Sequence, residues 1–259
     1  MKAIIRALAA LFLTAMPSTS WAEDQFKLLV IATPSTYHYE YIPVARESLE
    51  RLARLHAFGM TWTSDPAAFD GDLRQYAAVL FLNTPAEQLS KTQRAHFEDY
   101  MRTGGNAMVV HRAAIIPPKA WPWYEQLVGR SFINHPKLQT GVVTIADKGF
   151  PATFGVPDRW IWSDEFYVTS NPHRVTVSPV LKVDEDSYDP TKIWAGQTGT
   201  RMGDHLESWF HTYEKGRVFV SLLGHNAEMY RDERYLQHLL GGIYWTATGL
   251  GRQPAPVAP

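Results

Sequence analysis

The run Phe26-Lys27-Leu28-Leu29-Val30-Ile31-Ala32 is typical of a β-strand that is buried on both faces. Two further apolar runs of similar length follow at residues 77–82 and 106–111. The intervening residues 42–58 and 90–101 place apolar side chains at helical spacing. Strands that alternate with helices form parallel sheets covered on both faces, so this pattern predicts an α/β fold with a doubly wound parallel sheet.

The second half of the chain has a different pattern. Short strand-like segments, separated by Pro, Gly and Asp, follow Gly129 at residues 140–146, 175–183, 193–197 and 208–213. Such segments are typical of antiparallel strands, so we expect an antiparallel β-rich insert or an extension of the sheet. A core strand at 217–222 and a closing helix at 231–248 return to the pattern of the first half.

The composition excludes several classes of protein. The 259 residues are 45% hydrophobic and 20% charged, which is typical of a globular protein and not of a disordered chain or a coiled coil. A formal net charge of −1 argues against nucleic-acid binding. The chain has no cysteine, which excludes a thiol nucleophile, a thiolate-bound zinc and an iron–sulfur cluster. It also lacks both common phosphate-binding glycine motifs, so no nucleotide cofactor is expected.

The first residues have the pattern of an export signal. Lys2 and Arg6 are positively charged, residues 4–16 are almost wholly apolar, and Ser20-Trp21-Ala22 has small residues where a signal peptidase cleaves. The expected organisation is a signal peptide at 1–22, one domain at 23–249 and a disordered Pro-rich tail at 250–259.

This organisation predicts a periplasmic or secreted protein that is free of the membrane once the signal is cleaved. The alternative is an uncleaved membrane anchor. The apolar run is short for that role, because a spanning helix needs about 20 residues.

Candidate site residues follow from the fold class. Open α/β sheets bind ligands at the carboxyl ends of their strands. The polar side chains expected there are Tyr37, His38, Asn83, His111 and His225. The alternative is that these histidines only donate hydrogen bonds to loop carbonyls, which is less convincing for three histidines than for one.

A second group of candidates lies in the β-rich half. Asp164 and Glu165 are adjacent carboxylates among aromatic residues, and in an extended segment only one of them would face a site. A carboxyl buried there would have a raised pKa suited to acid–base work, whereas the alternative is a solvated turn. Tyr167, Trp121 and Trp123 are candidate sugar-stacking residues, although aromatic side chains are also common in cores.

A divalent metal ion, zinc or manganese, is a further possibility. A catalytic zinc site needs about three nitrogen or oxygen ligands. His38, His111, His135 and His225 are the candidate ligands, with Asp164 as a further donor. The chain has no HxH or HExxH spacing, so the spacing of these residues alone is a weak indication of a metal.

Several motifs occur in order along the chain: Tyr37-His38, Tyr76 to Leu82, Gly104-Gly105, Val110-His111, Trp121-Pro122-Trp123-Tyr124, His135-Pro136, Asp164-Glu165-Phe166-Tyr167, Leu223-Gly224-His225 and Leu239 to Trp245. Together they resemble the trehalose-utilisation (ThuA-like) family, within the class I glutamine-amidotransferase-like superfold. The resemblance implies a flavodoxin-like sheet, with His111 where amidotransferases carry their nucleophilic cysteine. It also implies a carbohydrate substrate, in particular a glycoside oxidised to a 3-keto sugar.

The resulting hypothesis is an exported protein that cleaves or isomerises a 3-keto glycoside, as a hydrolase, lyase or isomerase. His111 and His225 are the candidate bases or ligands, and Asp164 or Glu165 is the candidate acid or orienting carboxylate. Tyr37, Asn83, Trp121, Trp123 and Tyr167 are the candidate substrate contacts. Two alternatives stay open: a non-catalytic sugar-binding accessory protein and a metal-dependent esterase or amidase. The sequence leaves the oligomeric state open.

Overall fold

A computed structural model describes residues 23–117 and 119–251 of the chain. Within them, nine strands form one sheet in the order β2-β1-β3-β4-β11-β10-β9-β6-β7. The first five in that order are parallel; they are β2 (Gly59–Thr63), β1 (Lys27–Ile31), β3 (Ala78–Leu82), β4 (Ala107–Val110) and β11 (Gly216–Ser221). This order is that of flavodoxin-like sheets, so the predicted fold class is confirmed.

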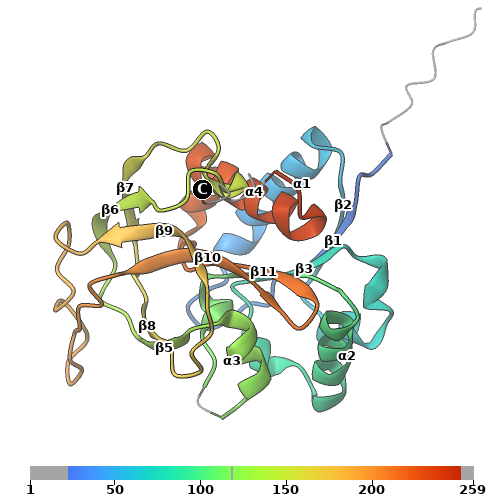
Figure 1. Cartoon of the computed structure of the whole chain (residues 1–259), viewed down its shortest axis with the longest axis horizontal. Helices are drawn as coiled ribbons and strands as arrows, with labels where there is room; N and C mark the ends of the chain where they lie inside the picture. The colour runs from blue at the N-terminus through green and yellow to red at the C-terminus, as the bar shows by residue number, and fades with distance from the viewer. Residues whose placement is uncertain (1–22, 118, 252–259) are drawn as a thin grey trace, which may run out of the picture.

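Helices cover both faces of the parallel half (Figure 1). One face carries α1 (Tyr41–Leu55) and α4 (Glu233–Thr248), and the other carries α2 (Lys91–Arg102) and α3 (Pro122–Val128). Because both faces are covered, every residue of β3 is buried, which explains its uninterrupted apolar sequence. The side chain of Ser90 caps α2 by accepting a hydrogen bond from the Gln93 backbone NH.

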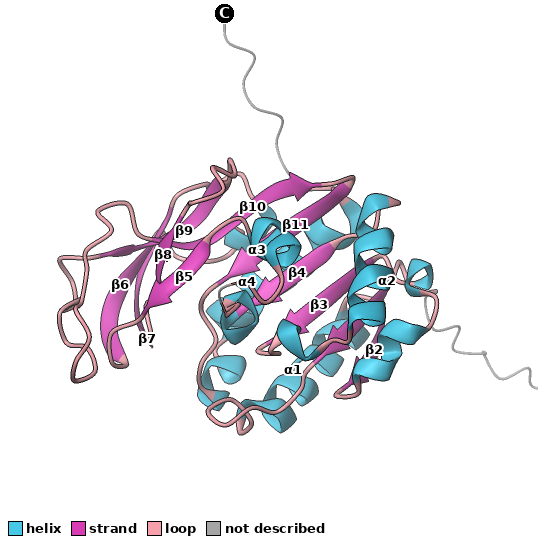
Figure 2. Cartoon of the chain, turned by 90° about the horizontal axis from the view of Figure 1, so that it is seen from below, coloured by secondary structure: helices cyan, strands magenta, loops and turns pink. Residues whose placement is uncertain are grey.

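The sheet continues on the other side of β11 as an antiparallel extension (Figure 2). Its strands are β10 (Leu206–Tyr213), β9 (Ser178–Asp184), β6 (Gln139–Ile145) and β7 (Arg159–Asp164). A separate antiparallel pair joins β5 (Ser131–Asn134) to β8 (Val168–Ser170). The expected strand at 193–197 is wrong, because these residues lie in the long loop between β9 and β10.

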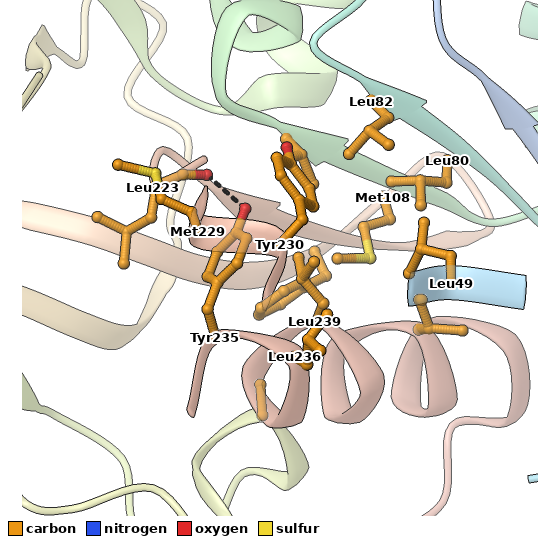
Figure 3. Close-up of a cluster of buried hydrophobic side chains, with 14 of the residues drawn as sticks. Leu49, Leu80, Leu82, Met108, Leu223, Met229, Tyr230, Tyr235, Leu236 and Leu239 are labelled. Atoms are coloured by element: carbon orange, nitrogen blue, oxygen red, sulfur yellow. Dashed lines mark hydrogen bonds between the residues drawn. The ribbon is translucent and has the colours of Figure 1, made fainter. Parts of the chain in front are cut away.

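The core between α4 and the sheet also supports the turn after β11. Leu236 and Leu239 of α4 pack with Leu80 and Met108 from the strands (Figure 3). The Tyr235 hydroxyl donates a hydrogen bond to the carbonyl of Leu223 at 2.9 Å, drawn dashed in Figure 3. Packing of α4 therefore positions the segment that precedes His225.

Two parts of the expected organisation lie outside the described residues. These are the signal peptide at 1–22 and all but the first two residues of the tail at 250–259. Among the described residues, no helix has both the length and the apolar character to cross a membrane.

Candidate functional site

Three histidines and one glutamate meet at the carboxyl edge of the parallel sheet. His38 follows β1, His111 follows β4, His225 follows β11, and Glu165 lies between β7 and β8. One ligand atom from each lies within 4.8 Å of all the others. We call these four residues the histidine cluster. Neighbouring parallel strands deliver their ends to the same edge of the sheet, and the antiparallel extension adds the carboxylate.

His111 has a strained backbone that aims its ring into the cluster. Its φ is +52°, in the left-handed region, at the sharp turn that follows β4. Nδ1 lies 2.6 Å from the carbonyl oxygen of Leu222, which can only accept, so Nδ1 carries the proton. Nε2 therefore presents a lone pair to the cluster, where the Tyr167 hydroxyl donates to it at 2.9 Å. Such strain and such an orienting carbonyl are frequent at functional sites.

His225 occupies the centre of the cluster. Its Nδ1 lies 3.1 Å from His38 Nε2, 3.3 Å from His111 Nε2 and 3.2 Å from Glu165 Oε2. The preceding Gly224 has a φ of +128°, and a Cβ there would lie 2.3 Å from the Tyr235 hydroxyl. Only glycine fits at this position, and the resulting turn directs His225 toward the other residues of the histidine cluster.

Asp164 is placed behind the cluster and not in it. Its buried carboxylate accepts hydrogen bonds from the backbone NH groups of Gly224 and Glu165, both at 2.9 Å, and from the Trp162 indole. Of the two adjacent carboxylates only Glu165 borders the cavity, as the alternation of an extended segment predicts. Asp164 therefore holds the turn that carries His225. Burial raises the pKa of the Asp164 carboxyl to about 6.

Burial sets the charge of the cluster. It lowers the pKa of His38 to about 4, helped by the neighbouring His225. Burial, with His38 and His225 next to it, also holds the pKa of His111 well below its usual value. Burial opposes protonation of His225 too, but the hydrogen bond and the charge of Glu165 raise its pKa. At neutral pH, His38 and His111 are thus neutral imidazoles, the form that binds metal ions.

The cluster borders a cavity of about 800 Å³, which is large enough for a small-molecule ligand. Its lining side chains come from loops at the carboxyl edge of the sheet and from the β-rich half; they include Tyr37, His38, Arg112, His135, Glu165, Tyr167, Trp194, Gln197 and His225. Tyr37 is 81% exposed at this rim, whereas Tyr167 is buried. His135 borders the cavity with Nδ1 3.7 Å from Glu165 Oε1, but it stands outside the histidine cluster.

Two of the residues expected to contact substrate, Trp121 and Trp123, lie elsewhere. Trp121 is buried against α2 and donates its indole NH to Glu98, while Trp123 packs on Phe97 and donates to Glu214. Trp121 belongs to the core under α3, Trp123 is partly buried and packs against the edge of that core, and neither lines the cavity. Their amphipathic helix faces the sheet and not the cavity.

Asn83 is also used within the protein. Its buried side chain donates to the Gly224 carbonyl at 2.9 Å and accepts from the Arg112 backbone NH at 3.2 Å. It therefore ties the ends of β3, β4 and β11 together beneath the cluster.

Several residues of the cavity wall were not among the chosen candidate site residues. Arg112 borders the cavity and pairs with Glu87 at 2.6 Å. Its position directly after His111 was the available signal. Trp194 and Gln197 come from the loop that was expected to be a strand, so only the fold places them near the cluster.

The donor set and its spacing fit a divalent metal ion. Three imidazoles and a carboxylate are typical zinc ligands. In a tetrahedral site with bonds of about 2.0 Å, ligand atoms lie about 3.3 Å apart. The three separations from His225 Nδ1, 3.1, 3.2 and 3.3 Å, are close to that spacing. The separation between His111 Nε2 and Glu165 Oε2 is longer, at 3.8 Å.

A second group of buried ionisable residues lies between β9 and β10; we call His205, Glu185 and Glu207 the sealed cluster. His205 Nδ1 lies 3.0 Å from Glu185 Oε1, and Nε2 lies 3.0 Å from the carbonyl oxygen of Tyr167. Glu207 Oε1 is 3.2 Å from Nε2, but the Glu207 carboxylate has no well-aligned hydrogen-bond partner among the described residues. All three side chains are buried.

The whole chain was compared with protein families and with solved structures. The family model for ThuA, described as trehalose utilisation, matches residues 27–246. A ThuA-like protein from Bacteroides uniformis is 23% identical with a TM-score of 0.74, and the match covers 89% of this chain and 95% of that one. A ThuA-like protein from Parabacteroides merdae is 18% identical with a TM-score of 0.69, covering 89% and 93%.

A more distant likeness is to the β-galactosidase from Rahnella sp. R3, at 12% identity and a TM-score of 0.56. It covers 88% of this chain and 32% of that enzyme. At these identities the solved structures establish a shared fold. A search of curated proteins finds no significant match.

Proposed function

The chain belongs to the ThuA family of trehalose-utilisation proteins, and from this premise we propose that it is a metal-dependent enzyme that cleaves 3-keto glycosides. The proposed ligands are His38, His111 and His225, and Glu165 lies beside the metal position as a group free for proton transfer. The observation that carries the proposal is the spacing of about 3.1 to 3.3 Å around His225 Nδ1 at the wall of a cavity of ligand size. Neutral, buried imidazoles beside one carboxylate support a cation in that position. Their ring nitrogens face one another with lone pairs that repel, and a bound cation would remove this repulsion.

The chemistry of a 3-keto glycoside fits this arrangement. The ketone acidifies the C–H bond at C2, and a base removes that proton. The electron pair then forms the C1–C2 double bond as the glycosidic C1–O bond breaks, and an acid protonates the departing oxygen. A bound divalent metal would stabilise the negative charge on the C3 oxygen.

The side chains left for proton transfer are Glu165 and His135, which lie 3.7 Å apart across the cavity wall. We assign the proton at C2 to Glu165 and the proton of the leaving oxygen to His135. This division changes the sequence-based assignment. His111 and His225 become ligands, and Asp164 becomes a positioning residue.

Elemental mass spectrometry of the purified protein tests the metal. We expect about one divalent ion per chain, lost in His111→Ala and kept in the control His56→Ala, which changes an exposed residue at the end of α1. The same proteins are then assayed on the 3-keto derivative of trehalose. Turnover that is unaffected by His111→Ala, or by removal of the metal with a chelator, contradicts the proposal.

Two other outcomes would identify the alternatives. Sugar binding without any product after long incubation would indicate an accessory protein. Chelator-sensitive hydrolysis of simple aryl esters, with no action on 3-keto glycosides, would indicate an esterase.

Export is part of the proposal and is supported by the sequence of residues 1–22 alone. If it is correct, protein recovered from the periplasm or the medium has Glu23 as its first residue. Recovery of the uncut chain from the cytoplasm would contradict it.

A further inference from the structure

A second hollow adjoins the cavity at the histidine cluster. It has a volume of about 290 Å³ and is lined by Phe132, Ile133, Asn134, His135, Trp194 and Gln197. Four of these residues, Phe132, His135, Trp194 and Gln197, also line the larger cavity. The two hollows therefore share a wall and form one surface. A volume of about 300 Å³ is at the lower end for a complete ligand site, so the smaller hollow suits one part of a larger ligand.

Trp194 is the prominent side chain of this shared wall. It is 46% exposed, whereas most of the other tryptophans among the described residues are buried or nearly so. Lys137 Nζ lies 5.2 Å from the centre of the indole, and the His135 ring meets it edge-on at 6.4 Å. Lys137 covers one face of the indole, and the rest of the exposed indole surface lines both hollows. A flat aromatic surface of this kind packs well against the C–H face of a sugar ring.

The loop that carries Trp194 is fixed to the β-rich half. The backbone NH of Lys137 donates to the Lys192 carbonyl at 2.8 Å, and the side chains of Asn134 and Gln139 donate to the carbonyls of Thr198 and Asp189. These bonds lie on both sides of Trp194 in the sequence. A ring held in place before binding loses little conformational entropy when a ligand packs on it.

We propose that the substrate carries two sugar rings and that Trp194 binds the second. The ring to be transformed lies at the histidine cluster, and the ring on the leaving side lies on Trp194 with Gln197 as its polar contact. This inference rests on the proposed function and specifies its substrate class, a disaccharide in preference to a monosaccharide glycoside. An aromatic leaving group would also pack on an indole, so the test must separate the two.

The test compares Trp194→Ala with Trp194→Phe on three substrates. These are the 3-keto derivatives of trehalose, of methyl α-glucoside and of phenyl α-glucoside. We expect Trp194→Ala to lose about tenfold in kcat/KM on the disaccharide, mainly through KM, and much less on the methyl glycoside, which has no second ring to pack on the indole. Trp194→Phe should retain most of the wild-type value. Metal content and melting temperature show that both variants are folded.

Equal losses on the disaccharide and the methyl glycoside, or no loss on either, would overturn the two-ring proposal while turnover persists. A loss confined to the phenyl glycoside would overturn the sugar assignment. If wild type turns over none of the three, the proposed function fails and binding decides the inference. In that case trehalose should shift the indole NH resonance that Trp194→Ala removes, and methyl α-glucoside at the same concentration should not; equal shifts overturn it.

Discussion

The histidine cluster and the sealed cluster contain the same kinds of residue in opposite states. In the histidine cluster, Nδ1–H of His111 donates a hydrogen bond to the carbonyl of Leu222, and Nε2 faces a ring nitrogen of His225. In the sealed cluster, both nitrogens of His205 face oxygens that accept. Burial opposes a charge on either ring, but Glu207 and Glu185 raise the pKa of His205, while no such pair surrounds His111 in the described structure.

The difference shows that burial alone does not decide the role of a histidine. A buried imidazole surrounded by acceptors is stabilised in its protonated form, since Glu207 and Glu185 raise the pKa of His205 against the effect of burial. A neutral buried imidazole whose N–H donates to one carbonyl keeps the lone pair of its other nitrogen, which can coordinate a metal ion. We expect the first arrangement to contribute to stability and the second to metal binding, so variants in the sealed cluster should change unfolding and variants in the histidine cluster should change metal content.

The largest expected effect is on stability, from His205→Ala. Removing one partner of a buried ion pair costs about 3 to 5 kcal/mol, because the remaining charges stay buried. Urea denaturation of the metal-free protein measures the loss. The matched control is His173→Ala, whose partly exposed pair with Glu125 should contribute less than about 1 kcal/mol. Equal losses in the two variants would mean that the sealed cluster is not a buried ion-pair network.

Glu207→Gln should change how stability depends on pH. Burial raises the pKa of the Glu207 carboxyl from 4.5 to about 7, against the opposing effect of His205. The folded protein therefore keeps a proton that the unfolded chain releases, and the wild type loses stability as pH rises from about 4.5 to about 7. Glutamine carries no such proton, so the variant should gain on the wild type over this range, by on the order of 3 kcal/mol.

Calorimetric melting temperatures at pH 5, 6, 7 and 8 test this sign. The exposed Glu228→Gln serves as control, because its neutralisation should leave the pH profile unchanged. A difference between wild type and Glu207→Gln that is constant across the range would show that Glu207 is charged throughout.

In the histidine cluster, His225→Ala should weaken metal binding at least about a hundredfold, since even residues that only support metal ligands are typically worth 10- to 100-fold. Stability without metal should change little. The matched variant is His135→Ala, which borders the same cavity but stands outside the cluster. It should lower turnover and keep the metal. Equal metal loss in both variants, measured by competition with a chromogenic chelator, would return His135 to the ligand set.

The smallest effect is expected for Tyr167→Phe, and its direction is informative. The Tyr167 hydroxyl donates to His111 Nε2, the lone pair that a metal ion would use. Without the hydroxyl this competition disappears, so metal affinity should rise severalfold, in line with about 1 kcal/mol for a hydrogen bond. Isothermal titration with zinc measures the change. A fall in affinity would mean that the hydroxyl assists metal binding.

Much of the fold was predictable because it depends on local pattern. The apolar runs of β1, β3 and β4 and the capped helix α2 appear at their expected positions. The strand-end rule also led to His38, His111 and His225. It was less successful for side chains after a strand that turn inward, such as Asn83, because the rule locates a strand end but not the direction of its side chain.

The sequence by itself determined the parallel half of the sheet and the edge at which its histidines gather, because strand and helix periodicity are properties of neighbouring residues. Only the tertiary structure decided the rest. It placed Glu165 in the cluster and Asp164 behind it, and it kept His135 outside. It buried Trp121 in the core, packed Trp123 against the edge of that core, and brought Trp194 to the cavity. It also lowers the pKa of His111 and raises that of His205. Contacts, burial and pKa values depend on atoms from segments far apart in the chain, and no local pattern encodes those distances.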